Sequence, residues 1–136
     1  MNSSRFSLNI HILTILALTK EELISSEYLA SSINVNPVLV RKELSLLKKV
    51  GYIGSKEGKN GGCYLAIAPE KIILSDLYKK VSDRSLINVV KNEPNLNCPI
   101  GIQIKNHLNS LFQDAENAFL EKLGCSSLKT FVQKFL

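Results

Sequence analysis

Apolar residues recur along the chain at spacings that predict a mainly helical fold. Residues 5–18 are apolar on most faces, which indicates a helix that is largely buried. A short helix is expected over residues 26–33, where either Ser25 or Ser26 can accept a backbone N–H as the N-cap. Its inner face is expected to carry Tyr28, Leu29 and Ile33.

A third helix, predicted over residues 37–50, has one apolar and one polar face. Val40, Leu44 and Leu47 follow the i, i+4, i+7 spacing of a buried helix face. Asn36 is a good N-cap before this helix, and Gly51 is a typical residue to end it. The opposite face presents a mostly basic set, namely Val38, Arg41, Lys42, Ser45, Lys48 and Lys49.

Two short strands are expected over residues 52–56 and 63–67. The link between them contains three glycines and a lysine, and glycine permits positive φ and a close approach of the backbone to a partner. The rest of the chain is predicted to form a helix at 75–81, a further turn or two at 85–90, a loop at 92–97, a long helix from 98 to about 124 and a short helix at 127–135.

This order of elements is that of a winged helix-turn-helix. We therefore predict a mainly α fold with a small two-stranded wing, in which residues 1–82 form the winged helix-turn-helix domain. Residues 83–98 connect this domain to residues 99–136, which hold the long helix and the short terminal helix. Apolar residues of the long helix repeat at 4-3-4-3 spacing, which is typical of paired helices and also of a core helix within one chain; they are Ile104, Leu108, Leu111, Ala115 and Ala118.

The net charge of the chain is modest, but the placement of its charges favours nucleic acid. There are 17 lysines and arginines against 12 aspartates and glutamates, a formal net charge of +5. Residues 36–62 alone hold six basic and two acidic side chains. A local basic patch attracts a polyanion, and nucleic acid is the usual one.

Composition also predicts the compartment. The sequence has neither a secretory signal nor an apolar stretch long enough to cross a bilayer, and three cysteines are an odd number for a secreted disulfide scaffold. A cytoplasmic protein without membrane contact is therefore expected.

The basic helix face and the wing together predict an interface with double-stranded DNA. A helix of this size fits the major groove, where Arg41 can bind guanine in a bidentate manner and Val38 can contact a thymine methyl group. Lysines of the same face suit phosphate, and the wing tip can lie along the backbone or the minor groove. The predicted DNA contacts are Arg5, Ser26, Asn36, Pro37, Val38, Arg41, Lys42, Ser45, Lys48, Lys59, Asn60 and Gly61.

Several segments also resemble a known family. Residues 35–42 (VNPVLVRK), 46–53 (LLKKVGYI), 58–62 (GKNGG), 73–78 (ILSDLY) and 98–101 (CPIG) look like the Rrf2-type transcription regulators. The resemblance covers nearly the whole chain and is strongest over residues 26–78. It implies a homodimeric regulator, usually a repressor, that binds a palindromic operator. It also implies that the helix over residues 99–124 is the dimerisation helix.

The cysteines depart from one pattern in that family. Many members hold an iron–sulfur cluster with three cysteines grouped just before the long helix, whereas only Cys98 stands there in this chain. Cys63 falls in a predicted strand and Cys125 beyond the long helix, so no cluster and no metal site are expected. Cys98 remains the redox-sensing candidate, because a thiolate at a helix N-cap is stabilised by the helix dipole. The alternative for Cys98 is a plain capping and packing residue.

Other functions are less favoured by the sequence. An enzyme is not expected, since there is no zinc motif, no phosphate loop before a helix and no nucleophile–base pairing. A regulator controlled by a small-molecule ligand stays open, because no residue excludes it. A winged-helix protein-interaction module without a DNA target also stays open, although the basic segment speaks against it.

Overall fold

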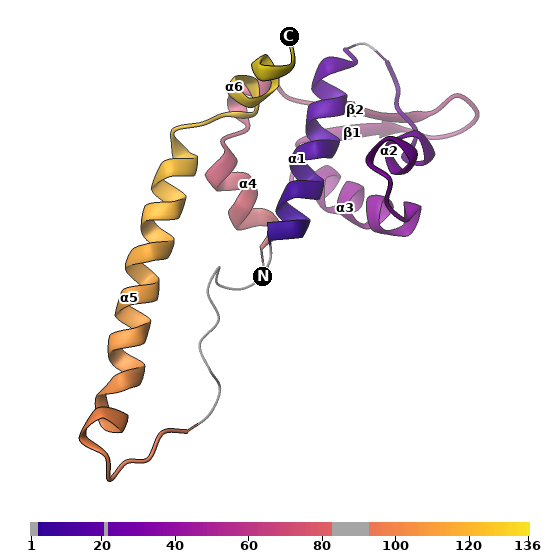
Figure 1. Ribbon diagram of the computed structural model, residues 1–136. Helices are drawn as coiled ribbons and strands as arrows, with labels where there is room; N and C mark the ends of the chain where they lie inside the picture. Colours follow the sequence, from indigo (N-terminus) through magenta and orange to yellow (C-terminus); the bar gives the residue numbers. More distant parts are fainter. Residues whose placement is uncertain (1–2, 21, 83–92) are drawn as a thin grey trace.

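The computed structural model describes residues 3–20, 22–82 and 93–136. These residues form a winged-helix body from which one long helix projects (Figure 1). The elements in chain order are α1 (Ser3–Leu18), α2 (Ser26–Ile33), α3 (Pro37–Lys49), β1 (Ile53–Lys56), β2 (Gly62–Leu65), η1 (Pro69–Lys71), α4 (Leu74–Val81), α5 (Pro99–Gly124), α6 (Leu128–Val132) and η2 (Gln133–Phe135). The turn predicted over residues 85–90 lies outside the described residues.

Local capping explains where α2 and α3 begin. The hydroxyl of Ser25 accepts the backbone N–H of Tyr28 at 3.1 Å, so the earlier of the two candidate serines is the N-cap of α2. The side-chain oxygen of Asn36 accepts the backbone N–H of Val38 at 2.8 Å and caps α3 as predicted. Gly51 follows α3 with a φ of +88°, a conformation that glycine adopts without strain and that ends the helix.

The core is made by the apolar faces of the helices and one side of the sheet. The predicted inner face of α3 is confirmed, because Val40, Leu44 and Leu47 are all buried. The prediction for α2 was wrong at Tyr28, which is 56% exposed. Leu29 and Ile33 are four positions apart and so lie on the same face of α2, which faces the core. Tyr28 lies off this face and points toward solvent.

The wing is an antiparallel pair of short strands. Ile53 lies opposite Leu65 and Gly54 opposite Tyr64. A Cβ atom on Gly54 would lie 2.4 Å from the Tyr64 ring, so the ring covers the position where a side chain would stand. The second strand ends at residue 65, two residues earlier than predicted, because the chain then turns toward η1.

Aromatic contacts join α1, α4 and α5. The ring of Tyr78 in α4 makes T-shaped contacts with Phe6 in α1 and Phe119 in α5, with ring centroids 5.3 and 5.0 Å apart. Only the carboxyl-terminal half of α5 is anchored in this way, and its other half runs away from the body (Figure 1).

The terminal helix α6 returns to the winged-helix body. The backbone N–H of Leu128 donates to the carbonyl of Ile72 at 2.7 Å, and that of Leu74 donates to the carbonyl of Ser126 at 3.0 Å. Leu128 and Val132 are buried in the common core. In its packing α6 therefore joins the body, although the sequence pattern places it with the long helix.

Candidate nucleic-acid interface

The polar face of α3 is presented to solvent. Val38, with 65% of its surface exposed, and Arg41 stand on this face, as do Lys42, Ser45 and Lys48. The sequence-predicted division of α3 into a buried and a basic face is therefore confirmed. No described atom covers this face heavily enough to bury any of these side chains.

The wing extends on the same side as α2 and α3, away from α5 (Figure 1). Its tip is a tight turn in which the backbone N–H of Gly61 donates to the carbonyl of Gly58 at 3.0 Å. A Cβ atom on Gly61 would lie 2.1 Å from the Lys56 carbonyl oxygen, so this turn requires glycine there. Lys59 and Asn60 are consequently exposed at the tip.

A groove of about 520 Å³ runs between the first turn of α2, the polar face of α3 and the wing. The Lys48 ammonium in α3 donates across it to the Ser55 hydroxyl in β1 at 2.7 Å. Lys56 of β1 and Arg41 of α3 also line the groove. The basic side chains of its lining (Arg41, Lys48 and Lys56) outnumber the carboxylates (Glu27 and Glu57). Its basic and hydroxyl groups suit phosphate oxygens.

An exposed ion pair connects the two helices of the helix-turn-helix. Arg41 donates from Nη2 to Oε1 of Glu27 at 3.2 Å, and both side chains remain more than half exposed. The Ser26 hydroxyl donates to the other carboxylate oxygen of Glu27 at 3.3 Å. A hydrogen bond from its own backbone, followed by those from Arg41 and Ser26, lowers the pKa of the Glu27 carboxyl. Sequence reasoning did not identify Glu27.

A second acidic residue, Glu43, has a different position. It belongs to α3 but is only 3% exposed, and Arg5 of α1 donates from Nε to its two carboxylate oxygens at 2.9 and 2.8 Å. The amide of Asn9 donates to the same carboxylate at 3.2 Å. Arg5 thus compensates the negative charge of Glu43 inside the body. The six basic residues of 36–62 are all exposed. The outer surface of this segment is more positive than its sequence indicates.

This internal pair changes the interpretation of Arg5. The sequence predicts Arg5 as a DNA contact, but its Nε is engaged with Glu43 and its side chain is 29% exposed. The position of Arg5 is explained by its bond to Glu43, which joins α1 to α3. Five of the other predicted residues line the groove, namely Ser26, Arg41, Ser45, Lys48 and Gly61. The remaining six are exposed outside its lining, namely Asn36, Pro37, Val38, Lys42, Lys59 and Asn60. The side chains of Asn36 and Ser45 already bond to the backbone of α3.

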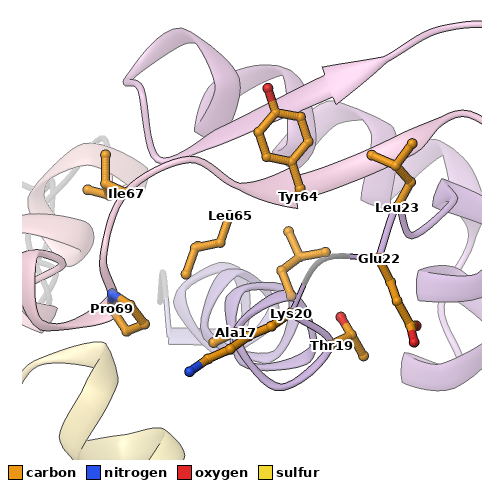
Figure 2. A pocket seen from close by; sticks show the side chains of 10 residues that line it. Ala17, Thr19, Lys20, Glu22, Leu23, Tyr64, Leu65, Ile67 and Pro69 are labelled. Carbon is orange, nitrogen blue, oxygen red and sulfur yellow. The ribbon is translucent and has the colours of Figure 1, made fainter.

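A separate hollow of about 400 Å³ lies between the end of α1 and the strand β2 (Figure 2). Leu65 of β2 faces Ala17 of α1 across it, and Lys20 and Glu22 stand at its edge with opposite charges. Its apolar floor differs in character from the basic groove. It is therefore not part of the candidate interface.

The three cysteines do not meet at one site. Cys63 is buried in β2, where desolvation raises the pKa of its thiol against an opposing effect of Lys48. Cys98 is the N-cap of α5, as predicted, and makes no side-chain capping hydrogen bond. Cys125 follows the other end of α5, roughly 40 Å away at the ordinary rise of an α-helix. Three thiolates of one chain therefore cannot hold an iron–sulfur cluster together.

Among residues 3–20, 22–82 and 93–136 no group of three or more His, Cys, Asp or Glu side chains is placed to hold a metal ion. In the same ranges no helix has both the length and the apolar character needed to cross a bilayer.

Comparison with known proteins agrees with this geometry. The model of the Rrf2 family, described as iron-dependent transcriptional regulators, matches residues 2–134. YwnA of Bacillus subtilis strain 168, assigned as an HTH-type transcriptional regulator, is 37% identical over 129 residues, which are 95% of each chain.

Solved structures share the fold. A crystal structure of a protein from Lactobacillus plantarum, assigned as a transcriptional regulator, superposes with a TM-score of 0.80 at 28% identity, covering 91% of this chain and 84% of that one. A crystal structure of a protein assigned as DNA-binding gives a TM-score of 0.72 at 34% identity, covering 92% and 96%. The match to the family model spans nearly the whole chain, and the chain belongs to the Rrf2 family of transcriptional regulators, which are DNA-binding proteins and not enzymes.

Proposed function

We propose that this regulator binds a palindromic DNA operator as a homodimer and acts as a repressor in the cytoplasm. The observation that carries the proposal is the basic groove between α3 and the wing. In the proposed complex α3 enters the major groove, with Arg41 against a guanine and Val38 against a thymine methyl group. Lys42, Lys48 and the wing-tip Lys59 contact phosphates, and the wing lies along the backbone.

The arrangement of donors supports this docking. The amino-terminal turns of α3 carry the side chains that reach base edges in helix-turn-helix proteins. The Lys48 ammonium is held toward the groove by its bond to Ser55, and Ser26 stands at the first turn of α2. Asn60 and Gly61 shape the wing tip. Arg5 is left out of the proposed contact set, because its Nε is bonded to Glu43.

The proposal of a homodimer rests on α5. None of its 26 residues is buried within the chain, although Ile100, Ile102 and Leu111 are large apolar side chains that are 58–72% exposed. The predicted stripe of residues 104–118 lies outside the hydrophobic core of the described residues. Only the carboxyl-terminal end of α5 packs on the core among the described residues, so the apolar stripe before it gains little stability while it faces water. A second copy of α5 would cover this stripe in the manner of paired helices.

A dimer also fits a palindromic operator. In two-fold symmetric helix-turn-helix dimers the recognition helices face successive major grooves, about 34 Å apart. The α5 helix lies on the opposite side of the body from the wing, so pairing through α5 leaves both α3 faces free (Figure 1).

The signal is proposed to act through Cys98. This thiol is half-buried at the first turn of the helix that is expected to pair, so oxidation would place a polar group at the edge of the dimer. An iron–sulfur cluster held by one chain is not proposed, because the cysteines are far apart. Mild peroxide should change the operator affinity of the wild type and leave that of Cys98→Ser unchanged. An equal response of both proteins would remove Cys98 from the mechanism.

Selection of bound sequences from random duplexes, followed by light scattering of the complex, tests the function. The expected result is an inverted repeat that binds two chains. Selection of a single half-site, or of no sequence above background, would contradict the proposal. A chain that binds no duplex but captures a protein partner would support the interaction-module alternative.

A further inference from the structure

The ion pair between Glu27 and Arg41 lies where the proposed recognition helix meets DNA. Arg41 is the fifth residue of α3, within the part that would face base edges. Glu27 is in the first turn of α2, and its Oε1 accepts a hydrogen bond from Arg41 Nη2 at 3.2 Å. Both residues line the basic groove. The carboxylate therefore faces the space that a phosphate backbone would occupy.

The Glu27–Arg41 ion pair contributes little to the stability of the fold. Both side chains are mostly exposed, and exposed ion pairs contribute little because water and salt screen them. The ion pair should therefore affect DNA binding by Arg41 and not the stability of the fold. A guanidinium has five N–H donors, and a single bond to Glu27 leaves most of them available.

Two consequences follow for DNA binding. The bond restricts the rotamers of Arg41, so less conformational entropy is lost when the guanidinium meets guanine in a bidentate manner. The negative charge of Glu27 repels the phosphates of any bound duplex and so weakens binding to every sequence. A carboxylate with a lowered pKa keeps this charge at neutral pH. The first effect favours the correct sequence over other sequences, whereas the second lowers the affinity for all of them.

We propose that Glu27 is a positioning residue that sets the sequence specificity of this regulator by holding Arg41 for a guanine. The inference rests on the proposed DNA-binding function. It assigns to α2 a role in base recognition, although α2 itself need not touch a base.

The test compares sequence preference in five full-length proteins, namely wild type, Glu27→Ala, Glu27→Gln, Arg41→Ala and Glu57→Ala. Each is used to select duplexes from a random pool, and its affinity for the selected and a scrambled duplex is measured. Glu57 is the matched control, since it also lines the groove and is exposed, but no described side chain bonds to it. Circular dichroism checks that each variant is folded.

Arg41→Ala should identify the operator position that Arg41 reads. Glu27→Ala should lose preference at that same position by about tenfold and bind scrambled DNA several-fold more tightly. Glu27→Gln should retain part of the preference, because its amide oxygen can still accept a bond from Arg41. Glu57→Ala should strengthen binding to every duplex and leave the preference intact.

The results separate failure of this inference from failure of the proposed function. If wild type selects an operator and Glu27→Ala keeps the same preference at the Arg41 position, the role of Glu27 is overturned. If Glu27→Ala and Glu57→Ala behave alike, the charge alone acts and positioning is overturned. If wild type binds no duplex, DNA binding itself is contradicted, and the role of Glu27 with it.

Discussion

Arg5 and Glu43, which are 38 residues apart in the chain, form an internal ion pair between α1 and α3 with 2.8 Å between Nε and Oε2. The carboxylate is 4% exposed at the side chain and takes a further hydrogen bond from Asn9. The pair fixes α3 against α1, the first helix of the fold. It also hides the negative charge of α3 from the surface proposed to meet DNA.

Replacement of Arg5 should therefore destabilise the protein. Arg5→Ala leaves the buried Glu43 carboxylate without its cation, which we expect to lower the free energy of unfolding by about 2–3 kcal/mol. Urea denaturation followed by circular dichroism measures this change. The double variant Arg5→Ala, Glu43→Leu removes both charges and should recover part of the loss. An unchanged urea midpoint in Arg5→Ala would contradict the structural role of Arg5.

A charge on the apolar stripe of α5 should break the dimer without unfolding the chain. Leu111 is 60% exposed, so Leu111→Lys adds no burial cost within one chain, but it buries two ammonium groups in the proposed interface. We expect dimer affinity to fall by roughly a hundredfold or more in sedimentation experiments. Gln113→Lys, on the opposite side of the same helix, should stay dimeric. Equal dissociation of both variants would argue against pairing through the stripe.

Variants of the proposed base contact and the proposed phosphate contact should differ in how their effect on affinity depends on the DNA sequence. Arg41→Ala should weaken operator binding by about 1–3 kcal/mol and relax the preference at one position. Lys59→Ala should weaken binding to all duplexes to a similar extent and reduce the salt dependence by about one phosphate contact. Fluorescence anisotropy with operator and scrambled duplexes distinguishes them. The assignment of α3 as the recognition helix would not survive equal operator affinities of wild type and Arg41→Ala.

The buried thiol of Cys63 should resist alkylation in the folded protein. Burial raises its pKa, so the fold favours the neutral thiol. The stability that this group contributes is complete below the ordinary thiol pKa of about 8.5 and is lost as pH rises through the raised value. Iodoacetamide labelling read by peptide mass spectrometry should modify exposed Cys125 well before Cys63 at pH 7, and the gap should vanish in urea. Labelling of both at one rate in the folded protein would show that Cys63 is not protected.

The element order could be predicted from the sequence because it depends on local signals. The spacing of Val40, Leu44 and Leu47 predicts the buried face of α3, and Asn36 predicts its start. The 4-3-4-3 stripe likewise predicts one apolar face on α5, while the sequence leaves open whether a second copy or the same chain covers it.

The remainder depends on contacts between residues that are distant in the chain. Glu43 lies three residues after Val40 and four before Leu47, so the helical spacing does place it on the buried face. What the spacing cannot reveal is that Arg5 compensates its charge from another helix. The pairing of Glu27 with Arg41 and the return of α6 to the η1 turn have the same non-local character.

Salt-dependent binding to the selected operator tests the central claim most directly. Anisotropy of a labelled duplex would be measured with the full-length protein at several salt concentrations between about 50 and 200 mM. We predict that the logarithm of the affinity falls linearly with the logarithm of salt concentration and that a scrambled duplex binds at least about a thousandfold more weakly. Equal affinity for operator and scrambled duplexes, or an affinity that does not change with salt, would contradict a sequence-specific regulator that binds DNA through its basic groove.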